Sequence, residues 1–141
     1  MNIDEMEAGR ELDALVAEKA MGWEWRRFPH AGDDVRALVS PESWLFSARE
    51  KAIGDERLAG GWNYNVPNYS TKIADAWEVV NAMRDRGLSV NINVDSPENS
   101  TLVSCSLHKP DLHETMVTEK IAETAPLAIC LVALASAEGE K

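Results

Sequence analysis

The chain has 141 residues, of which 45% are hydrophobic and 27% charged, as expected for one globular domain spanning residues 1–141. Twenty-four acidic and fourteen basic residues give a formal net charge of −10, which argues against general nucleic-acid binding because the protein repels phosphate backbones. The start is acidic and the longest apolar run, residues 125–137, is too short for a bilayer. These features predict a cytoplasmic protein without a membrane segment.

The first helix is predicted over about residues 4–21, with Asp4 as its cap and Gly22 as its end. Gly9 weakens the first half of this prediction, since glycine inside a helix costs about 1 kcal/mol relative to alanine. The stable part of the helix is therefore expected to begin near Arg10.

Residues 23–61 have an irregular pattern. The sequence Ser40-Pro41-Glu42 favours a short helix over residues 41–53, because proline suits the first helical position. A strand near residues 37–39 is the alternative.

A second helix is predicted over about residues 70–86, with Ser70 as cap and Gly87 as terminator. Its apolar residues recur at steps of three and four, which places Trp77 in the core. Residues 88–95 then alternate apolar and polar side chains, and residues 101–108 return after a turn, which predicts an antiparallel hairpin. Since a lone hairpin is marginally stable, further strands must come from residues 23–66 or another subunit.

The last helix is predicted over about residues 117–137, either kinked at Pro126 or restarted by a Thr124 cap. Its apolar second part, from residue 125, is expected at the centre of the domain or in a subunit contact. The order of elements predicts an α+β fold with helices packed on an antiparallel sheet. Cys105 and Cys130 are expected as reduced core thiols, because two isolated cysteines make neither a disulfide framework nor a zinc ribbon.

Three stretches of the chain resemble the phage ABA sandwich domain family of small phage and prophage proteins. They are residues 9–19 followed by Met21-Gly22-Trp23, residues 67–80, and residues 122–130. The resemblance implies an α-β-α sandwich in a phage-encoded protein, and it supplies no reaction or catalytic residues. The section between Trp23 and Trp62 is the least similar to the family.

The stretch of residues 61–71 carries the strongest functional signal, because it combines three aromatic and three asparagine residues. Aromatic rings can stack on a base, asparagine amides can read its polar edge, and free amides at a helix start favour an anion. The predicted ligand-binding residues here are Trp62, Asn63, Tyr64, Asn65, Tyr69, Ser70 and Thr71. In the alternative interpretation, Trp62 and Tyr69 hold the loop to the core, and Tyr69 and Ser70 serve the helix entry.

Three further side chains are candidates for binding phosphate. Arg26 and Arg27 are the paired bases of an acidic chain, although an edge strand with outward arginines also explains them. His108 can donate to a phosphate, as can His113, but neither has the neighbours that a metal site needs. No metal and no cofactor is therefore expected.

The chain lacks a glycine-rich phosphate loop, a His-Glu-x-x-His motif and a nucleophile elbow. Catalysis by Cys105 with His108 is disfavoured, because a core cysteine is a poor nucleophile unless its pKa is lowered. We therefore expect a non-enzymatic phage protein, a homo-oligomer in the host cytoplasm, that sequesters a nucleotide-derived immune signal of the cyclic nucleotide or cyclic ADP-ribose type. The alternatives are an acidic inhibitor of a host defence effector and an enzyme that cleaves such a signal with His108 or His113.

Overall fold

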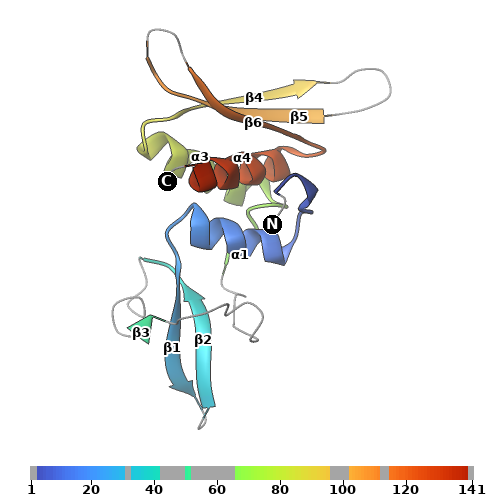
Figure 1. The fold of residues 1–141 in the computed structure, drawn as a ribbon. Coiled ribbons are helices and arrows are strands. Elements are labelled where there is room, and N and C mark those ends of the chain that lie inside the picture. Colours follow the sequence, from blue (N-terminus) through green and yellow to red (C-terminus); the bar gives the residue numbers. More distant parts are fainter. Residues whose placement is uncertain are drawn as a thin grey trace.

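Two antiparallel sheets lie at opposite ends of the molecule, with the helices between them (Figure 1). The computed structural model describes residues 3–30, 33–41, 50–51, 66–95, 102–111 and 115–139. In chain order these residues form the 3-10 turn η1 (Ile3–Glu5), α1 (Arg10–Lys19), β1 (Glu24–His30), β2 (Asp33–Val39), β3 (Glu50–Lys51), α3 (Ile73–Asp85), β4 (Ser89–Asp95), β5 (Leu102–His108), β6 (Met116–Ala122) and α4 (Ala125–Gly139).

The C-terminal sheet has the strand order β4-β5-β6. Its β4–β5 hairpin confirms the prediction for residues 88–95 and 101–108, with Ile92 opposite Cys105 at its centre. Val103, Cys105 and Leu107 are buried towards the helices. The alternation that predicted the hairpin thus reports which side chains enter the core.

The third strand of this sheet, β6, corrects the prediction of a helix from residue 117. Residues 116–122 pair antiparallel with β5, and most of their side chains are exposed or half-buried. The less exposed side chains, Thr118, Lys120 and Ala122, alternate with exposed ones, but two of them are polar. The sequence therefore lacks the apolar–polar alternation by which a strand is recognised.

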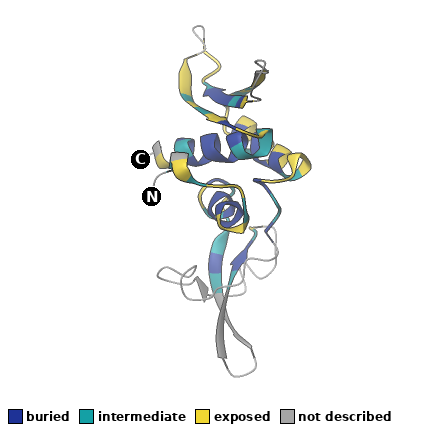
Figure 2. Ribbon diagram, turned by 90° about the vertical axis from the view of Figure 1, so that its right-hand side faces the viewer, coloured by how far each residue is buried: buried dark blue, intermediate teal, exposed yellow. Residues whose placement is uncertain are grey.

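Helices α3 and α4 lie side by side on one face of this sheet, and α1 packs on α4 from the opposite side (Figure 1). The α+β fold with helices packed on an antiparallel sheet is therefore confirmed. Most of α4 is buried at the centre of the molecule, as its apolar sequence predicted (Figure 2). Thr124 caps it, since its hydroxyl accepts from the Leu127 N–H at 3.3 Å, and the helix begins at Ala125, directly after β6.

Helix α1 is shorter than the predicted range of residues 4–21, and it begins at Arg10 as the glycine argument indicated. Gly9 has a φ of 155° at the N-cap, a conformation open mainly to glycine. At the other end, Gly22 has a φ of 78°, and the guanidinium of Arg86 donates to the Ala20 carbonyl. The last turn of α1 is thus closed by a residue from the end of α3.

Helix α3 begins at Ile73 rather than at residue 70, and Lys72 is its N-cap without a side-chain hydrogen bond. The helix ends as predicted at Gly87, whose φ of 85° accompanies the Leu88 N–H to Met83 carbonyl bond of a Schellman motif. The placement of Trp77 in the core is wrong, since its exposed fraction is 49%. The buried side of α3 consists of Ala76, Val79, Val80 and Met83.

The N-terminal sheet has the order β2-β1-β3, so β1 lies between two strands and the prediction of an edge strand is wrong. Strand β2 bears out the alternative of a strand near residues 37–39. Trp25 and Leu38 face each other across β1 and β2, and both belong to the main core. The predicted helix over residues 41–53 falls mostly outside the described residues, and Glu50–Lys51 form the strand β3 instead.

Candidate ligand-binding site

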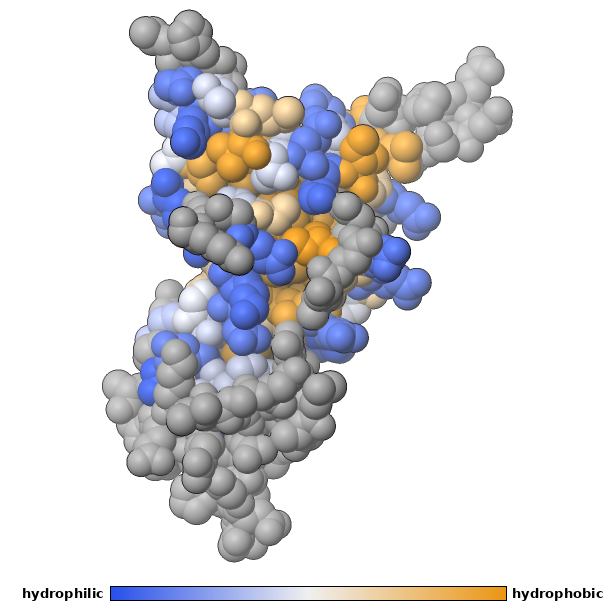
Figure 3. All heavy atoms as spheres, viewed as in Figure 1, coloured by the Kyte–Doolittle hydropathy of each residue, from blue (hydrophilic) through white to orange (hydrophobic). Residues whose placement is uncertain are grey.

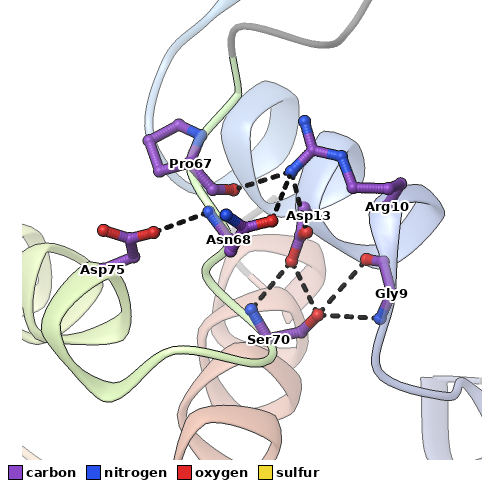
Figure 4. A network of polar contacts seen from close by, with 7 residues as sticks. All are labelled: Gly9, Arg10, Asp13, Pro67, Asn68, Ser70 and Asp75. Atoms are coloured by element: carbon purple, nitrogen blue, oxygen red, sulfur yellow. Dashed lines mark hydrogen bonds and ion pairs between the residues drawn. The ribbon is translucent and has the colours of Figure 1, made fainter.

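The segment of residues 66–71, which follows the aromatic-asparagine stretch, is held against the start of α1 by a polar network (Figure 4). Asp13 is its centre and is only 1% exposed. Its carboxylate accepts from the Ser70 backbone N–H at 2.8 Å, from the Ser70 hydroxyl at 2.6 Å, and from Arg10 at 3.2 Å. Buried charges need such partners to offset the loss of hydration, so this network fixes the segment firmly.

Two neighbouring contacts extend the network along the segment. Arg10 also donates to the Asn68 side-chain oxygen at 3.0 Å, and the Asn68 N–H donates to Asp75 at 2.8 Å. The Gly9 N–H donates to the Ser70 hydroxyl oxygen at 2.9 Å. The segment therefore joins α1 to the first turn of α3.

The network removes Tyr69 and Ser70 from the predicted ligand-binding residues. Their exposed fractions are 1% and 0%, and the Ser70 hydroxyl is engaged by Asp13 instead of capping a helix. Burial, followed by the negative charges of Glu78 and Asp75, raises the pKa of Tyr69. Tyr69 is buried in the core, which is the position that the alternative interpretation gave it, and Ser70 is bound to Asp13. Thr71 is exposed next to them.

The remaining predicted residues of the stretch, Trp62, Asn63, Tyr64 and Asn65, lie outside the described residues. The chain resumes at Val66, which is 3% exposed and belongs to the main core. The peptide that carries the predicted stacking side chains is thus covalently joined to a fixed, buried point.

The arginine pair on β1 is only partly described. The guanidinium of Arg26 lies 2.5 Å from the carboxylate of Glu24, and its side chain is 14% exposed. A carboxylate this close neutralises the charge that a phosphate would need, so Arg26 is a weaker phosphate partner than the sequence suggested. The side chain of Arg27 lies outside the described part of the structure.

His108 lies at the end of β5, on the sheet face turned away from the helices. Its Nε2 is 2.9 Å from the hydroxyl oxygen of Ser106, which is 5% exposed. Across the strands, Ser106 is opposite Asn91 and Glu119. The spacing of two residues on a strand brings Ser106 and His108 to one face, as the alternation of residues 101–108 predicts. His113 falls outside the described residues.

An open hollow of about 470 Å³ is lined by residues 5–12 at the N-terminal end of α1. Glu5, Glu7 and Glu11 contribute three carboxylates to its lining. Their charges repel a phosphate, so this hollow does not suit the anionic ligand predicted above.

The model of one protein family, described as the phage ABA sandwich domain, matches residues 14–134. The chain belongs to the phage ABA sandwich domain family. Searches of curated proteins and of solved structures gave no match.

The three stretches that resemble the phage ABA sandwich domain meet in the structure. Residues 9–19 form α1 with its cap, residues 67–80 form the anchored segment and most of α3, and residues 122–130 lead into α4. The Asp13–Ser70 bonds join the first two stretches, and α4 packs against both helices. The three stretches therefore form the helical scaffold of this chain.

Both cysteines of this family member are buried thiols, as predicted. Burial raises the pKa of Cys105 to about 12. Burial also raises the pKa of Cys130, with smaller contributions from Asp13 and Cys105. Because the thiolate is the nucleophile, the proposed attack by Cys105 with His108 is disfavoured.

Among the described residues, no group of three or more His, Cys, Asp or Glu side chains is arranged to hold a metal ion. Over the same part of the chain, none of the helices combines the length and the apolar character needed to cross a membrane.

Proposed function

We propose that this phage ABA sandwich protein is a non-enzymatic homo-oligomeric binding protein of the host cytoplasm. It sequesters a nucleotide-derived immune signal of the cyclic nucleotide or cyclic ADP-ribose class and so counteracts antiviral defence. The observation that carries the proposal is the anchoring of residues 66–70 directly after the stretch Trp62-Asn63-Tyr64-Asn65.

This anchoring matters for affinity. Binding by a peptide that must first be ordered loses free energy, about 0.5–1.5 kcal/mol for each immobilised side chain. Val66, Tyr69 and Ser70 are already fixed in the core, so ligand binding does not have to order them. The two rings then supply stacking, worth about 1–3 kcal/mol for each base.

The high thiol pKa values support a binding role over covalent catalysis. A sequestering protein needs only differential affinity and returns its ligand unchanged, so it requires no activated nucleophile. Cys105 and Cys130, held neutral by burial, fit that requirement.

The direct test is the thermal stability of purified protein with and without candidate cyclic nucleotides. A signal present at a hundred times its dissociation constant should stabilise the fold by about 2.7 kcal/mol. Trp62→Ala and Asn63→Ala should abolish the shift. The matched control is Asn81→Ala, which changes an exposed asparagine on α3. The absence of any shift in the wild type, together with the absence of released nucleotide on denaturation, refutes the proposal.

One observation favours a second candidate, an enzyme that cleaves the signal. The Ser106 hydroxyl and His108 Nε2 are within hydrogen-bond distance, the arrangement that general acid–base chemistry requires. Chromatography of the signal after incubation separates the two candidates. Sequestration predicts intact signal from wild type and from His108→Ala. Cleavage predicts that the wild type and the Trp62→Ala variant form product when mixed with the signal. The His108→Ala variant should form none.

A further inference from the structure

Strand β4 is an edge strand with little protection. Within the described residues it pairs only with β5. It has seven residues, with no proline and no charged residue between Ser89 and Val94. The other edge, β6, carries Glu119 and Lys120 and has a register irregularity where it meets β5 at His108. Charges and bulges are the usual protection of sheet edges, so β4 is the edge suited to pairing with another strand.

Exposed apolar side chains gather on the elements at this edge. Val94 is 65% exposed, on the face of β4 that points to the helices. Helix α3 packs against β4, while α4 packs against β5 and β6. Ile73 and Trp77 of α3 are 53% and 49% exposed. Hydrophobic areas of the surface at this sheet end are separated by hydrophilic ones in the view of Figure 3.

The hydrogen bond of Asp75 shows which way this side of α3 faces. Asp75 accepts from the Asn68 N–H, so its side of α3 faces the anchored segment. Trp77 and Ile73 are each two residues away and therefore lie about 160° around the helix from Asp75. The stripe from Ala76 to Met83 between these sides is buried. Ile73 and Trp77 thus face away from the anchored segment, on the helix that packs against β4.

We propose that β4 pairs with β4 of a second copy of the chain, antiparallel, with Ile92 opposite Ile92 of the second copy. Val90 is then opposite Val94, Asn91 opposite Asn93, and Ser89 opposite Asp95, in both directions. The two sheets become one continuous six-stranded sheet. The Ile73–Trp77 sides of the two α3 helices approach each other beneath it.

Self-complementarity is the reason for this occupant and this register. A two-fold axis through Ile92 keeps every apolar residue of β4 on the helix face and every asparagine on the outer face. This register pairs all seven residues of both strands, and a shift along the strand leaves residues of each unpaired. The Asn91–Asn93 pairs can exchange amide hydrogen bonds, and Val94 loses its exposure beside Val90. The inference deepens the homo-oligomeric part of the proposed function, on which it rests, but needs no bound ligand.

The first test measures the mass of the unliganded protein in solution by light scattering during size-exclusion chromatography. The wild type is expected to be a dimer or a multiple of one. Val94→Lys should weaken association at least tenfold, because it places a charge opposite Val90 of the second copy. Ile121→Lys is the matched control, since Ile121 is 59% exposed on β6 at the opposite edge. A monomeric wild type, or a dimer unaffected by Val94→Lys, overturns the proposal.

The second test reads the register. Ile92→Cys should form a covalent dimer under mild oxidation, because directly opposite Cα atoms in a sheet are within disulfide range. Val94→Cys should not form this covalent dimer, because residue 94 of one copy lies about 13 Å along the strands from residue 94 of the other. Cys105 and Cys130 are buried and do not interfere. Random collisions favour the more exposed Val94 position, so equal or stronger cross-linking there overturns the register.

These outcomes are separate from those of the ligand test. A protein that dimerises through β4 but binds no nucleotide refutes only the sequestration. A protein that binds nucleotide as a monomer refutes the β4 dimer and the homo-oligomeric state, but not the sequestration.

Discussion

Ser70 follows Asp13 by 57 residues, yet its backbone N–H and its hydroxyl both donate to the same oxygen of the Asp13 carboxylate, at 2.8 and 2.6 Å. This pair joins α1 to the segment that leads into α3, and both helices pack against α4. It also determines which residues of the aromatic-asparagine stretch belong to the scaffold. Tyr69 and Ser70 lie on the scaffold side, and the functional proposal rests on residues 62–65.

Replacing Asp13 by alanine should destabilise the protein by about 3 kcal/mol. The change leaves the Ser70 N–H and hydroxyl buried without their acceptor, and such unsatisfied groups lose their full solvation. Urea denaturation measures the loss. Asp85→Ala, an exposed aspartate at the end of α3, should change stability by no more than about 0.5 kcal/mol. Equal effects of the two changes contradict a structural role for the network.

The conformation of Gly87 gives a second prediction. Its φ of 85° is strained for a residue with a Cβ, although the structure leaves space for one. Gly87→Ala should therefore cost about 1 kcal/mol, and Gly87→Asn less, because asparagine tolerates the left-handed region better. The thermal midpoints of the two variants and the wild type provide the comparison. An alanine variant as stable as the wild type rules out the Schellman end of α3.

Arg86 closes the last turn of α1 from the end of α3, and Arg86→Ala should cost about 1 kcal/mol. The loss arises because the Ala20 carbonyl loses its charged donor. Arg84→Ala removes a neighbouring exposed arginine and should have an effect within about 0.5 kcal/mol. The free energy of unfolding is measured by chemical denaturation. If Arg84→Ala lowers it as much as Arg86→Ala does, the loss of a positive charge and not the loss of the carbonyl contact is responsible.

The buried thiols predict a loss of stability at alkaline pH. Burial raises the pKa of Cys105 to about 12 and that of Cys130 as well, so both stay neutral in the folded protein. In the unfolded chain they ionise at about pH 8.5. Their contribution to folding is therefore complete below that pH and is lost as pH rises towards 12. The urea midpoint of the wild type should be lower at pH 10 than at pH 7.5. The difference should be smaller in a variant that carries both Cys105→Ala and Cys130→Ala. A wild type whose midpoint does not fall with pH contradicts the buried, neutral thiols.

Much of the fold followed from sequence because local signals agreed with the tertiary structure. The alternation from Val90 to Val94 gave β4, and Gly22 and Gly87 gave two helix ends. The presence of Gly9 correctly predicted that α1 begins at Arg10. In each case the residue type itself limits the backbone, so no distant contact was needed to interpret it.

The wrong predictions lie where contacts with residues distant in the sequence determine the structure. Ser70 is a good cap by type, but Asp13 binds its hydroxyl, and α3 starts three residues later. Trp77 has core spacing, but it lies beside the buried stripe of α3. Strand β6 depends on pairing with β5, which its own residues do not indicate. The candidate site was predicted from residue chemistry alone, and its part in residues 66–71 proved to be joined to the scaffold through Ser70.

The central claim is most directly tested by native mass spectrometry of the protein isolated from infected cells with an active defence system. The proposed function predicts an oligomer that carries an additional small mass, which denaturation releases as an intact nucleotide absorbing near 260 nm. The same protein from cells without the defence system should lack that mass. An oligomer or monomer of bare chain mass from both sources contradicts the claim.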